Sequence, residues 1–262
     1  MSGALEFDDR MARGIEIMYQ TTDVVAQRLA THRMLDLRAG EAVLDIGCGP
    51  GLLAEEMAVT VGPAGRVRGI DLSADMVAMS ERRCAGQDWA AFEVADAAAL
   101  PYPDGHFDAA ASTQVYEYVE DVLSVLVELH RVLRPGGRAL IIDTDFDSLV
   151  LHSDDRALTE RILTAWDGHF MHRDLPRKLS PLLREAGFVI GRRDVLPMFN
   201  PEYHRNAFGS HLVRVMADFA IDREGITKEE ADAWIAGLEK LGAEGRFFFS
   251  LNRYLFLAEK PG

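Results

Sequence analysis

The sequence has few cysteines and no long apolar run. Only Cys48 and Cys84 occur among 262 residues, which excludes a disulfide framework and indicates a reducing compartment. The most apolar stretch, 247–258, contains Asn252 and Arg253 and is shorter than the roughly 20 residues of a membrane-spanning helix. The first residues lack the basic start and apolar core of a secretory signal. We therefore expect a cytoplasmic protein with no membrane partner.

Positive charge is also scarce. The chain has 28 Lys and Arg against 42 Asp and Glu, which gives a formal net charge of −14. Proteins that bind nucleic acid usually present a basic surface, because phosphate contacts dominate their affinity. We therefore expect a small-molecule ligand and no nucleic-acid partner. The composition does not specify an oligomeric state, so a homo-oligomer stays open.

Strand-like and helix-like segments alternate through the first 150 residues. Such alternation indicates β-α-β units and a parallel sheet. After residue 146 the pattern loosens, and β-propensity returns near 188–196 and 246–260. The expected strands of the first part cover residues 41–47, 66–72, 89–96, 107–113 and 138–146. Outside this alternating part, apolar residues recur at helical spacing in segments 6–35, 154–166, 176–186, 203–220 and 227–241.

The segment VLDIGCGPG, residues 43–51, raises the main functional question. A strand-like run reaches an acid and then three glycines within five residues, so we expect a ligand to approach the backbone there. In open α/β sheets, ligands bind beyond the carboxyl ends of the strands. The dinucleotide fingerprint needs a third glycine where Leu52 stands, and no Gly-Lys-Ser/Thr follows as in a P-loop.

Acids end three successive expected strands. Asp71 can accept hydrogen bonds from ribose hydroxyls, and Asp96 can accept one from an exocyclic amine such as that of adenine. Asp45 lies close to where a cationic amino group would sit. Together they describe a ligand with a ribose, an adenine and a positive charge. They would repel a pyrophosphate, which disfavours an NAD(P)-dependent oxidoreductase, although that function is kept as an alternative.

With these residues the chain resembles the class I S-adenosylmethionine (SAM)-dependent methyltransferases, in particular the small-molecule group that is similar to the ubiquinone/menaquinone methyltransferases (methyltransferase type 11). The matching segments are VLDIGCGPG, GIDLSADM, VADAAALPYPDGHFDAA, YVEDVLSVLVELHRVLRPGG and ALIIDTD, in this order over about residues 41–145. The resemblance implies an α/β, Rossmann-like fold. Its seven-stranded sheet is mostly parallel with an antiparallel last strand, and N-terminal helices and a helical cap accompany it.

The resemblance and the segment pattern together predict four regions. Residues 1–37 form an N-terminal helical lid, and residues 38–197 form the SAM-binding core. Residues 198–245 form a helical cap insertion, and residues 246–262 add the final strand. SAM is the implied cofactor. By family pattern, the residues expected to contact it are Tyr19, Arg28, Asp45, Gly47, Cys48, Gly49, Gly51, Asp71, Leu72, Met76, Asp96, Ala97 and Gln114.

The expected reaction is methyl transfer to a small organic molecule. Such an in-line displacement is driven mainly by proximity, and a general base is needed only where the acceptor is protonated. Candidate catalytic residues are Tyr116, Asp145 and His152. Candidate acceptor contacts are Glu117, Phe146, Trp166, His169, Tyr203, His204 and Phe208. A SAM-binding protein without methyl transfer stays open, because the motif reports binding and not turnover.

Two further patterns restrict the chemistry. The Asn/Asp-Pro-Pro-Tyr signature of nucleic-acid amino methyltransferases is absent where STQVY stands, residues 112–116. Asp143, Asp145 and Asp147 share one face of a strand, as metal ligands can. A calcium loop, however, needs glycine where Ser148 stands and glutamate where Asp154 stands. We therefore expect no metal.

Overall fold

The computed structural model describes residue 14 and residues 16–262 of the chain. The parts of the expected lid and first helix that fall on residues 1–13 and 15 lie outside the described residues. Within these limits, no helix combines the length and apolarity needed to cross a bilayer.

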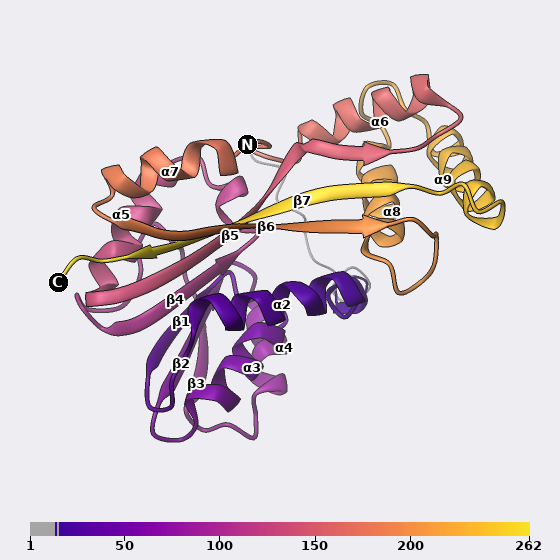
Figure 1. The fold of residues 1–262 in the computed structure, drawn as a ribbon. Helices are drawn as coiled ribbons and strands as arrows, with labels where there is room; N and C mark the ends of the chain where they lie inside the picture. The colour runs from indigo at the N-terminus through magenta and orange to yellow at the C-terminus, as the bar shows by residue number, and fades with distance from the viewer. Residues whose placement is uncertain (1–13, 15) are drawn as a thin grey trace.

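A seven-stranded sheet forms the centre of the protein, in the order β3-β2-β1-β4-β5-β7-β6 (Figure 1). Strands β1 to β5 pair in parallel, and β7 runs antiparallel to both β5 and β6. This confirms the expected sheet with its antiparallel last strand. The strands are β1 (Ala42–Ile46), β2 (Arg66–Asp71), β3 (Ala90–Val94), β4 (Phe107–Thr113), β5 (Leu133–Leu151), β6 (Val189–Asn200) and β7 (Phe249–Glu259).

Helices cover both faces of the sheet. Three of them, α2 (Thr22–Leu35), α3 (Leu52–Val61) and α4 (Ala74–Arg83), pack on one face. The other face is covered by α5 (Val122–Val132) and α7 (Pro176–Glu185). Strand β1 is buried along its whole length between the two layers. A strand enclosed in this way has no solvent-facing side, which explains why its sequence is apolar up to the acid.

Side-chain caps fix several helix starts. Ser73 accepts a hydrogen bond from the Met76 amide at the start of α4, as its position before the helix predicts. A threonine also precedes α2, but it does not cap the helix. Thr21 occupies the N-cap position, but its hydroxyl donates to the Met18 carbonyl instead. The segment before α2 folds back in a turn that offers this nearer acceptor.

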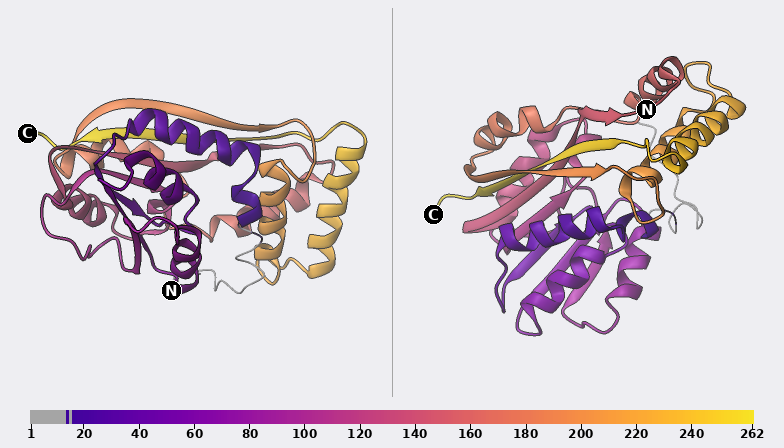
Figure 2. Two further views of the ribbon diagram at one scale, coloured as in Figure 1. Left: turned by 90° about the horizontal axis from the view of Figure 1, so that it is seen from below. Right: turned by 45° about the vertical axis from the view of Figure 1, so that its right-hand side comes forward.

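The last three strands of the sheet order are long and carry a separate helical layer (Figure 2). This layer contains α6 (Arg156–Asp167), α8 (Phe208–Ala220) and α9 (Lys228–Ala243), which share one apolar cluster with the ends of β6 and β7. The helix α6 therefore packs with the expected cap at residues 198–245, although α6 comes earlier in the sequence. Strand β5 extends past the expected end at Phe146 because it pairs again with β7 at residues 150–151.

Candidate cofactor and acceptor site

The glycine loop follows β1 and enters α3. All three glycines adopt positive φ, at 68° for Gly47, 53° for Gly49 and 81° for Gly51. A Cβ at Gly47 would lie 2.3 Å from a methyl of Val115, and a Cβ at Gly51 would lie 2.8 Å from the Ser80 backbone. A Cβ at Gly49 meets only the Tyr19 ring, at 3.8 Å. Packing therefore requires the outer two glycines, whereas the middle one leaves room for a Cβ beneath the Tyr19 ring.

Asp71 ties this loop to the end of β2. Its carboxylate accepts from the Gly49 amide at 3.0 Å and from the Ser73 amide at 2.9 Å. Burial raises the pKa of Asp71, and these backbone hydrogen bonds act in the opposite direction. The side chain thus fixes the loop and still presents a half-buried carboxylate at the sheet edge.

Asp45 is a buried acid without a donor. It is 1% exposed at the end of β1, and its Oδ2 has no hydrogen-bond partner among residues 14 and 16–262. Burial, and secondly the Asp71 charge, raise the pKa of Asp45 to about 8. A buried carboxylate of this kind is costly unless a cation or donor meets it. The Asp45 carboxylate can therefore accept a hydrogen bond from the amino group of a ligand, as the sequence predicts.

The expected adenine contacts lie at the next strand ends. Asp96 is exposed after β3, and one of its carboxylate oxygens accepts from the Ala98 amide. Leu72 is 73% exposed beside Asp71, while Met76 and Ala97 are buried. An exposed leucine next to two acids offers an apolar surface for a flat ring. Cys48 is buried behind the loop, where burial raises the pKa of its thiol.

Two predicted residues come from the segment before β1. Tyr19 lies over Gly49. Arg28 donates from Nη1 to the Tyr19 carbonyl at 2.7 Å and from Nε to Glu56 at 2.8 Å. In this structure the Arg28 guanidinium therefore holds Tyr19 in place and is neutralised by Glu56, so a ligand carboxylate would have to compete with Glu56 for it.

The loop after β4 supplies the other side of the site. Gln114 has a positive φ of 60°, and its amide donates to the Ile142 carbonyl at 2.8 Å. The Thr144 hydroxyl donates to its side-chain oxygen. Glu117, in the short helix η1 (Tyr116–Tyr118), is 1% exposed and accepts from the Thr144 amide at 3.1 Å. Burial raises the pKa of Glu117 to about 7.

The three candidate catalytic residues do not come together. Tyr116 is fully buried in the core cluster that faces α5 and α7, where its hydroxyl lacks a partner among the described residues. Asp145 is held by Arg177, with nitrogen–oxygen distances of 2.7 and 3.0 Å. His152 follows β5, with its ring 4.0 Å from Asp154. Their proximity in sequence to strands β4 and β5 does not carry over to a shared site.

Of the predicted acceptor contacts, three join an aromatic cluster beside Glu117. Phe146 stacks on Phe170 with ring centroids 4.2 Å apart, and Trp166 stacks on His169 at 4.4 Å. Tyr118 contacts the His169 ring edge at 5.2 Å. Burial lowers the pKa of His169 to about 4, so its ring is neutral at pH 7.

The remaining predicted contacts lie elsewhere in the cap. Tyr203 packs against Phe247 at a centroid distance of 5.1 Å. His204 accepts from the Asn206 amide in an exposed turn. Phe208 is buried at the start of α8.

Arg253 is a residue that the sequence reading missed. It is 5% exposed in β7, donates to the Gln27 side chain, and stands 4.7 Å above the Phe208 ring. A signal was present, because a guanidinium interrupts a strand that is otherwise mostly apolar. Tyr118 and Phe170 were missed as well, since single aromatic residues in loops carry no local pattern.

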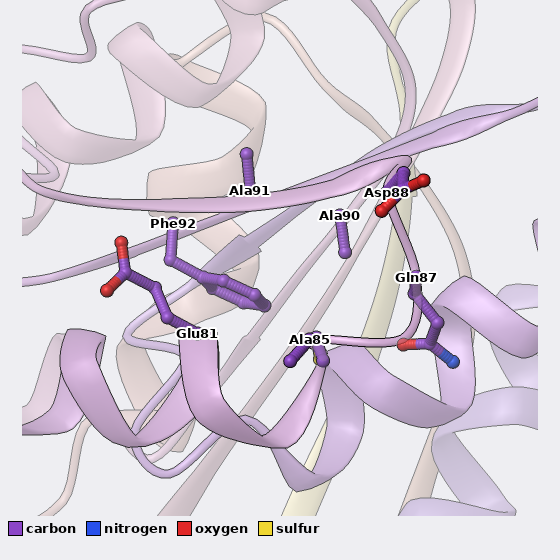
Figure 3. Close-up of a pocket in the computed structure, with 8 residues that line it drawn as sticks. Glu81, Ala85, Gln87, Asp88, Ala90, Ala91 and Phe92 are labelled. Carbon is purple, nitrogen blue, oxygen red and sulfur yellow. The ribbon is translucent and has the colours of Figure 1, made fainter.

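Neither a metal cluster nor the pocket of Figure 3 adds to this site. No group of three potential metal ligands occurs in the part of the chain that the structure describes. Asp145 and Asp147 are instead paired with Arg177. The pocket in Figure 3, of about 310 Å³, lies between the end of α4 and the start of β3, with Phe92 and Gln87 in its lining. It is at the amino end of the parallel strands, away from the glycine loop.

Comparison with known proteins agrees with this geometry. Residues 44–141 match the model of a methyltransferase domain family. An uncharacterized 37.1 kDa protein in transposon TN4556 of Streptomyces fradiae is 39% identical over 86% of this chain, which spans 64% of that protein's length. The demethylmenaquinone methyltransferase of Lactococcus lactis is 30% identical over 60% of this chain and 69% of its own length.

A solved structure shows the same fold. Phosphoethanolamine N-methyltransferase 2 of Haemonchus contortus, in complex with SAM, superposes with a TM-score of 0.64 at 20% identity. The match covers 98% of this chain and 58% of that protein. The glycine loop, the acids at three strand ends and these relatives lead to one conclusion: the chain belongs to the class I SAM-dependent methyltransferases, in the group that includes the menaquinone and ubiquinone methyltransferases.

Proposed function

We propose that this protein transfers the methyl group of SAM to a small organic molecule. The observation that carries the proposal is Asp45, a buried carboxylate whose Oδ2 has no donor among residues 14 and 16–262, beside a glycine loop that has room at Gly49. The SAM amino group supplies the missing donor. The relatives that are named as quinone methyltransferases support an acceptor with an aromatic or isoprenoid body.

The proposed cofactor contacts follow the strand ends. Asp45 receives the amino group, and Gly49 allows the methionine portion to approach the backbone. Asp71 accepts from the ribose hydroxyls, and Asp96 accepts from the adenine amine. Leu72 and Met76 pack on the adenine ring, with Tyr19 covering the loop. In this arrangement Arg28 acts mainly through Tyr19, whose carbonyl it already binds.

Bound SAM supplies an electrophilic methyl group, and the chain's own residues align an acceptor against it. Gln114 and Thr144 form a hydrogen-bonded pair next to the expected methionine end. Glu117, whose pKa is raised to about 7 by burial, can accept a proton from an acceptor that binds protonated. Alignment that excludes water can contribute roughly 7–11 kcal/mol to such a step.

The proposed regions are those expected from the sequence, with one revision. The lid runs to residue 37, the core covers 38–197, the cap covers 198–245, and the final strand follows. The apolar cluster that α6 shares with α8 and α9 supports moving α6 from the core to the cap. We also propose a cytoplasmic location without a nucleic-acid partner. Two free, buried cysteines and the net charge of −14 support this.

Thermal unfolding with S-adenosylhomocysteine (SAH), and separately with NADH and NADPH, tests the proposal. Ligand at a hundred times its dissociation constant stabilises by about 2.7 kcal/mol, which is a shift of several degrees. We expect a shift with SAH alone. A shift only with a nicotinamide cofactor would reject the proposal. SAH binding without transfer of labelled methyl to any member of an aromatic and isoprenoid acceptor panel would favour a SAM-binding protein that does not methylate.

A further inference from the structure

Arg253 is a buried cation that lacks a counterion. Its side chain forms no ion pair with residues 14 and 16–262, and its Nε has no hydrogen-bond partner there. Its described contacts are the Gln27 amide oxygen and the face of Phe208. Burial lowers the pKa of Arg253. Because an unpaired buried guanidinium is costly, a site that retains one has a use for its free donors.

Three acids act on Arg253 through space, namely Asp23, Glu117 and Asp143, and the first two are already hydrogen-bonded elsewhere. Asp23 accepts from the Asn200 side chain and from the Phe208 amide. Glu117 accepts from the Thr144 amide. Both acids act on Arg253 only through space. The guanidinium therefore keeps donors that no described carboxylate takes.

Its position places these donors on the acceptor side. Arg253 is the register partner of Thr144 in the β5–β7 pair, and the Thr144 hydroxyl donates to Gln114. Gln114 is the residue expected near the methionine end of SAM. The Tyr19 and Tyr118 side chains lie close enough to Arg253 to affect its pKa. Tyr118 also contacts the His169 ring of the aromatic cluster.

We propose that Arg253 binds a carboxylate of the methyl acceptor, whose apolar body lies along Tyr118, His169 and Phe170. The inference rests on the proposed function and adds the substrate class, an organic acid. Arginine suits this role because its planar fork matches a carboxylate with two parallel hydrogen bonds. The neutral His169 ring and the phenyl rings offer stacking partners without a competing charge.

Glu117 makes this binding depend on pH. Glu117 interacts electrostatically with Arg253 on β7, with Asp143 on β5, and with the tyrosines Tyr118 and Tyr19. Burial raises the pKa values of Glu117 and Asp143, to about 7 for Glu117. Below pH 7 Glu117 is uncharged and does not repel an anion bound beside it. Above pH 7 its negative charge repels the anion, so carboxylate binding weakens as the pH rises.

The test uses the SAH-saturated full chain and ligand-observed NMR. The probes are benzoate, phenylacetate and cinnamate, each against its own amide. We expect each acid that binds to bind at least about tenfold more tightly than its amide, which corresponds to about one hydrogen-bonded charge pair. Arg253→Gln removes the preference and leaves the SAH affinity unchanged. Arg177→Gln, which alters a cation already paired with Asp145, keeps the preference and serves as the control.

Specific outcomes overturn the inference. They are equal binding of acids and amides, failure of every acid to bind at millimolar concentration, or a preference that survives in Arg253→Gln. A tenfold loss of SAH affinity in Arg253→Gln would assign the residue to the cofactor's carboxylate instead. Failure of the wild-type chain to bind SAH would reject the proposed function, which is a separate result.

Two further readings separate binding from a structural role. A residue needed for folding would lower the melting temperature when replaced. Arg253→Gln is instead expected to keep or raise the melting temperature of the ligand-free chain, because it removes an unpaired buried charge. Glu117→Gln is expected to abolish the pH dependence of phenylacetate binding between pH 6 and pH 8, and retention of that dependence would contradict the account.

Discussion

The two ends of the sheet form their parts of the site in different ways. Around β1, β2 and β3, the groups proposed to face the cofactor are glycines and acids that stand at or just after a strand end. Around β5 and β7, the polar groups are side chains inside the fold, brought together from α2, η1 and two strands. The first end depends on backbone conformation, and the second depends on which strands are neighbours.

This difference explains how each part responds to change. A strand-end acid such as Asp71 is held by two adjacent backbone amides, so its position survives changes elsewhere. Arg253 keeps its place only because β7 lies between β5 and β6. The cofactor end is therefore expected to be sensitive to backbone substitutions, and the acceptor end to charge substitutions.

The largest contrast is expected within the glycine loop. Gly51→Ala places a Cβ 2.8 Å from the Ser80 backbone at a φ of 81°, so we expect a loss of about 2–4 kcal/mol in unfolding free energy. Gly49→Ala meets only the Tyr19 ring, at 3.8 Å, and is expected to cost about 1 kcal/mol while it weakens SAH binding. Urea unfolding and SAH titration measure both. Equal stability losses would break the distinction between packing and ligand-facing glycines.

Asp45→Asn is expected to stabilise the ligand-free chain at alkaline pH. The pKa of Asp45 is raised from 3.8 to about 8 in the folded chain. Its contribution to stability is therefore present below the unfolded pKa and is lost as the pH rises through about 8. At pH 9 the variant should gain about 1–3 kcal/mol, with no gain at pH 4, and should lose the shift with SAH. Melting curves of both proteins between pH 4 and pH 9 measure this gain. Destabilisation of the variant at pH 9 would mean that Asp45 has a hydrogen-bond donor in the folded chain.

Asp71→Asn and Asp96→Asn compare two expected cofactor acids. The Asp71 side chain also holds the Gly49 amide, while Asp96 is exposed and accepts only from Ala98 nearby. We expect SAH affinity to fall about tenfold or more with Asp71→Asn, or about 1.4 kcal/mol, and less with Asp96→Asn. Calorimetric titration measures both. The reverse order would show that the adenine contact dominates.

Asp145→Asn is expected to have the smallest effect. Asp145 is itself buried, but its partner Arg177 on α7 is half-exposed, so solvent screens the pair and reduces its contribution. SAH affinity should be unchanged and the melting temperature nearly so. A marked loss of methyl transfer with an identified acceptor would restore Asp145 as a catalytic residue.

The sequence predicted the elements whose signals are local. The first four expected strands matched β1 to β4 closely, because each apolar run ends in a turn, a cap or a glycine. Strand β5, in contrast, begins five residues earlier and ends five residues later than expected. The helices α8 and α9 were also found from their apolar spacing, near residues 203–220 and 227–241.

Features that depend on sheet order were not predicted. Arg253 and Gln27 are 226 residues apart in sequence, and only the position of β7 brings them together. The aromatic cluster needs α6 to fold back on α8, which no local pattern indicates. Tyr116 illustrates a related limit of sequence-based prediction. Its position in the sequence suggested a place near the methyl group, but its side chain packs in the core against α5.

The continuity of β5, β6 and β7 has a consequence for how a substrate enters. The same strands form part of the core sheet and extend beneath the cap helices (Figure 2), so a hinge between core and cap would have to bend a hydrogen-bonded ribbon. Tyr19 and α2 are held on the other side by Arg28 and a few side-chain bonds. We therefore expect access to a bound SAM to depend on the segment before β1, while the cap keeps its position.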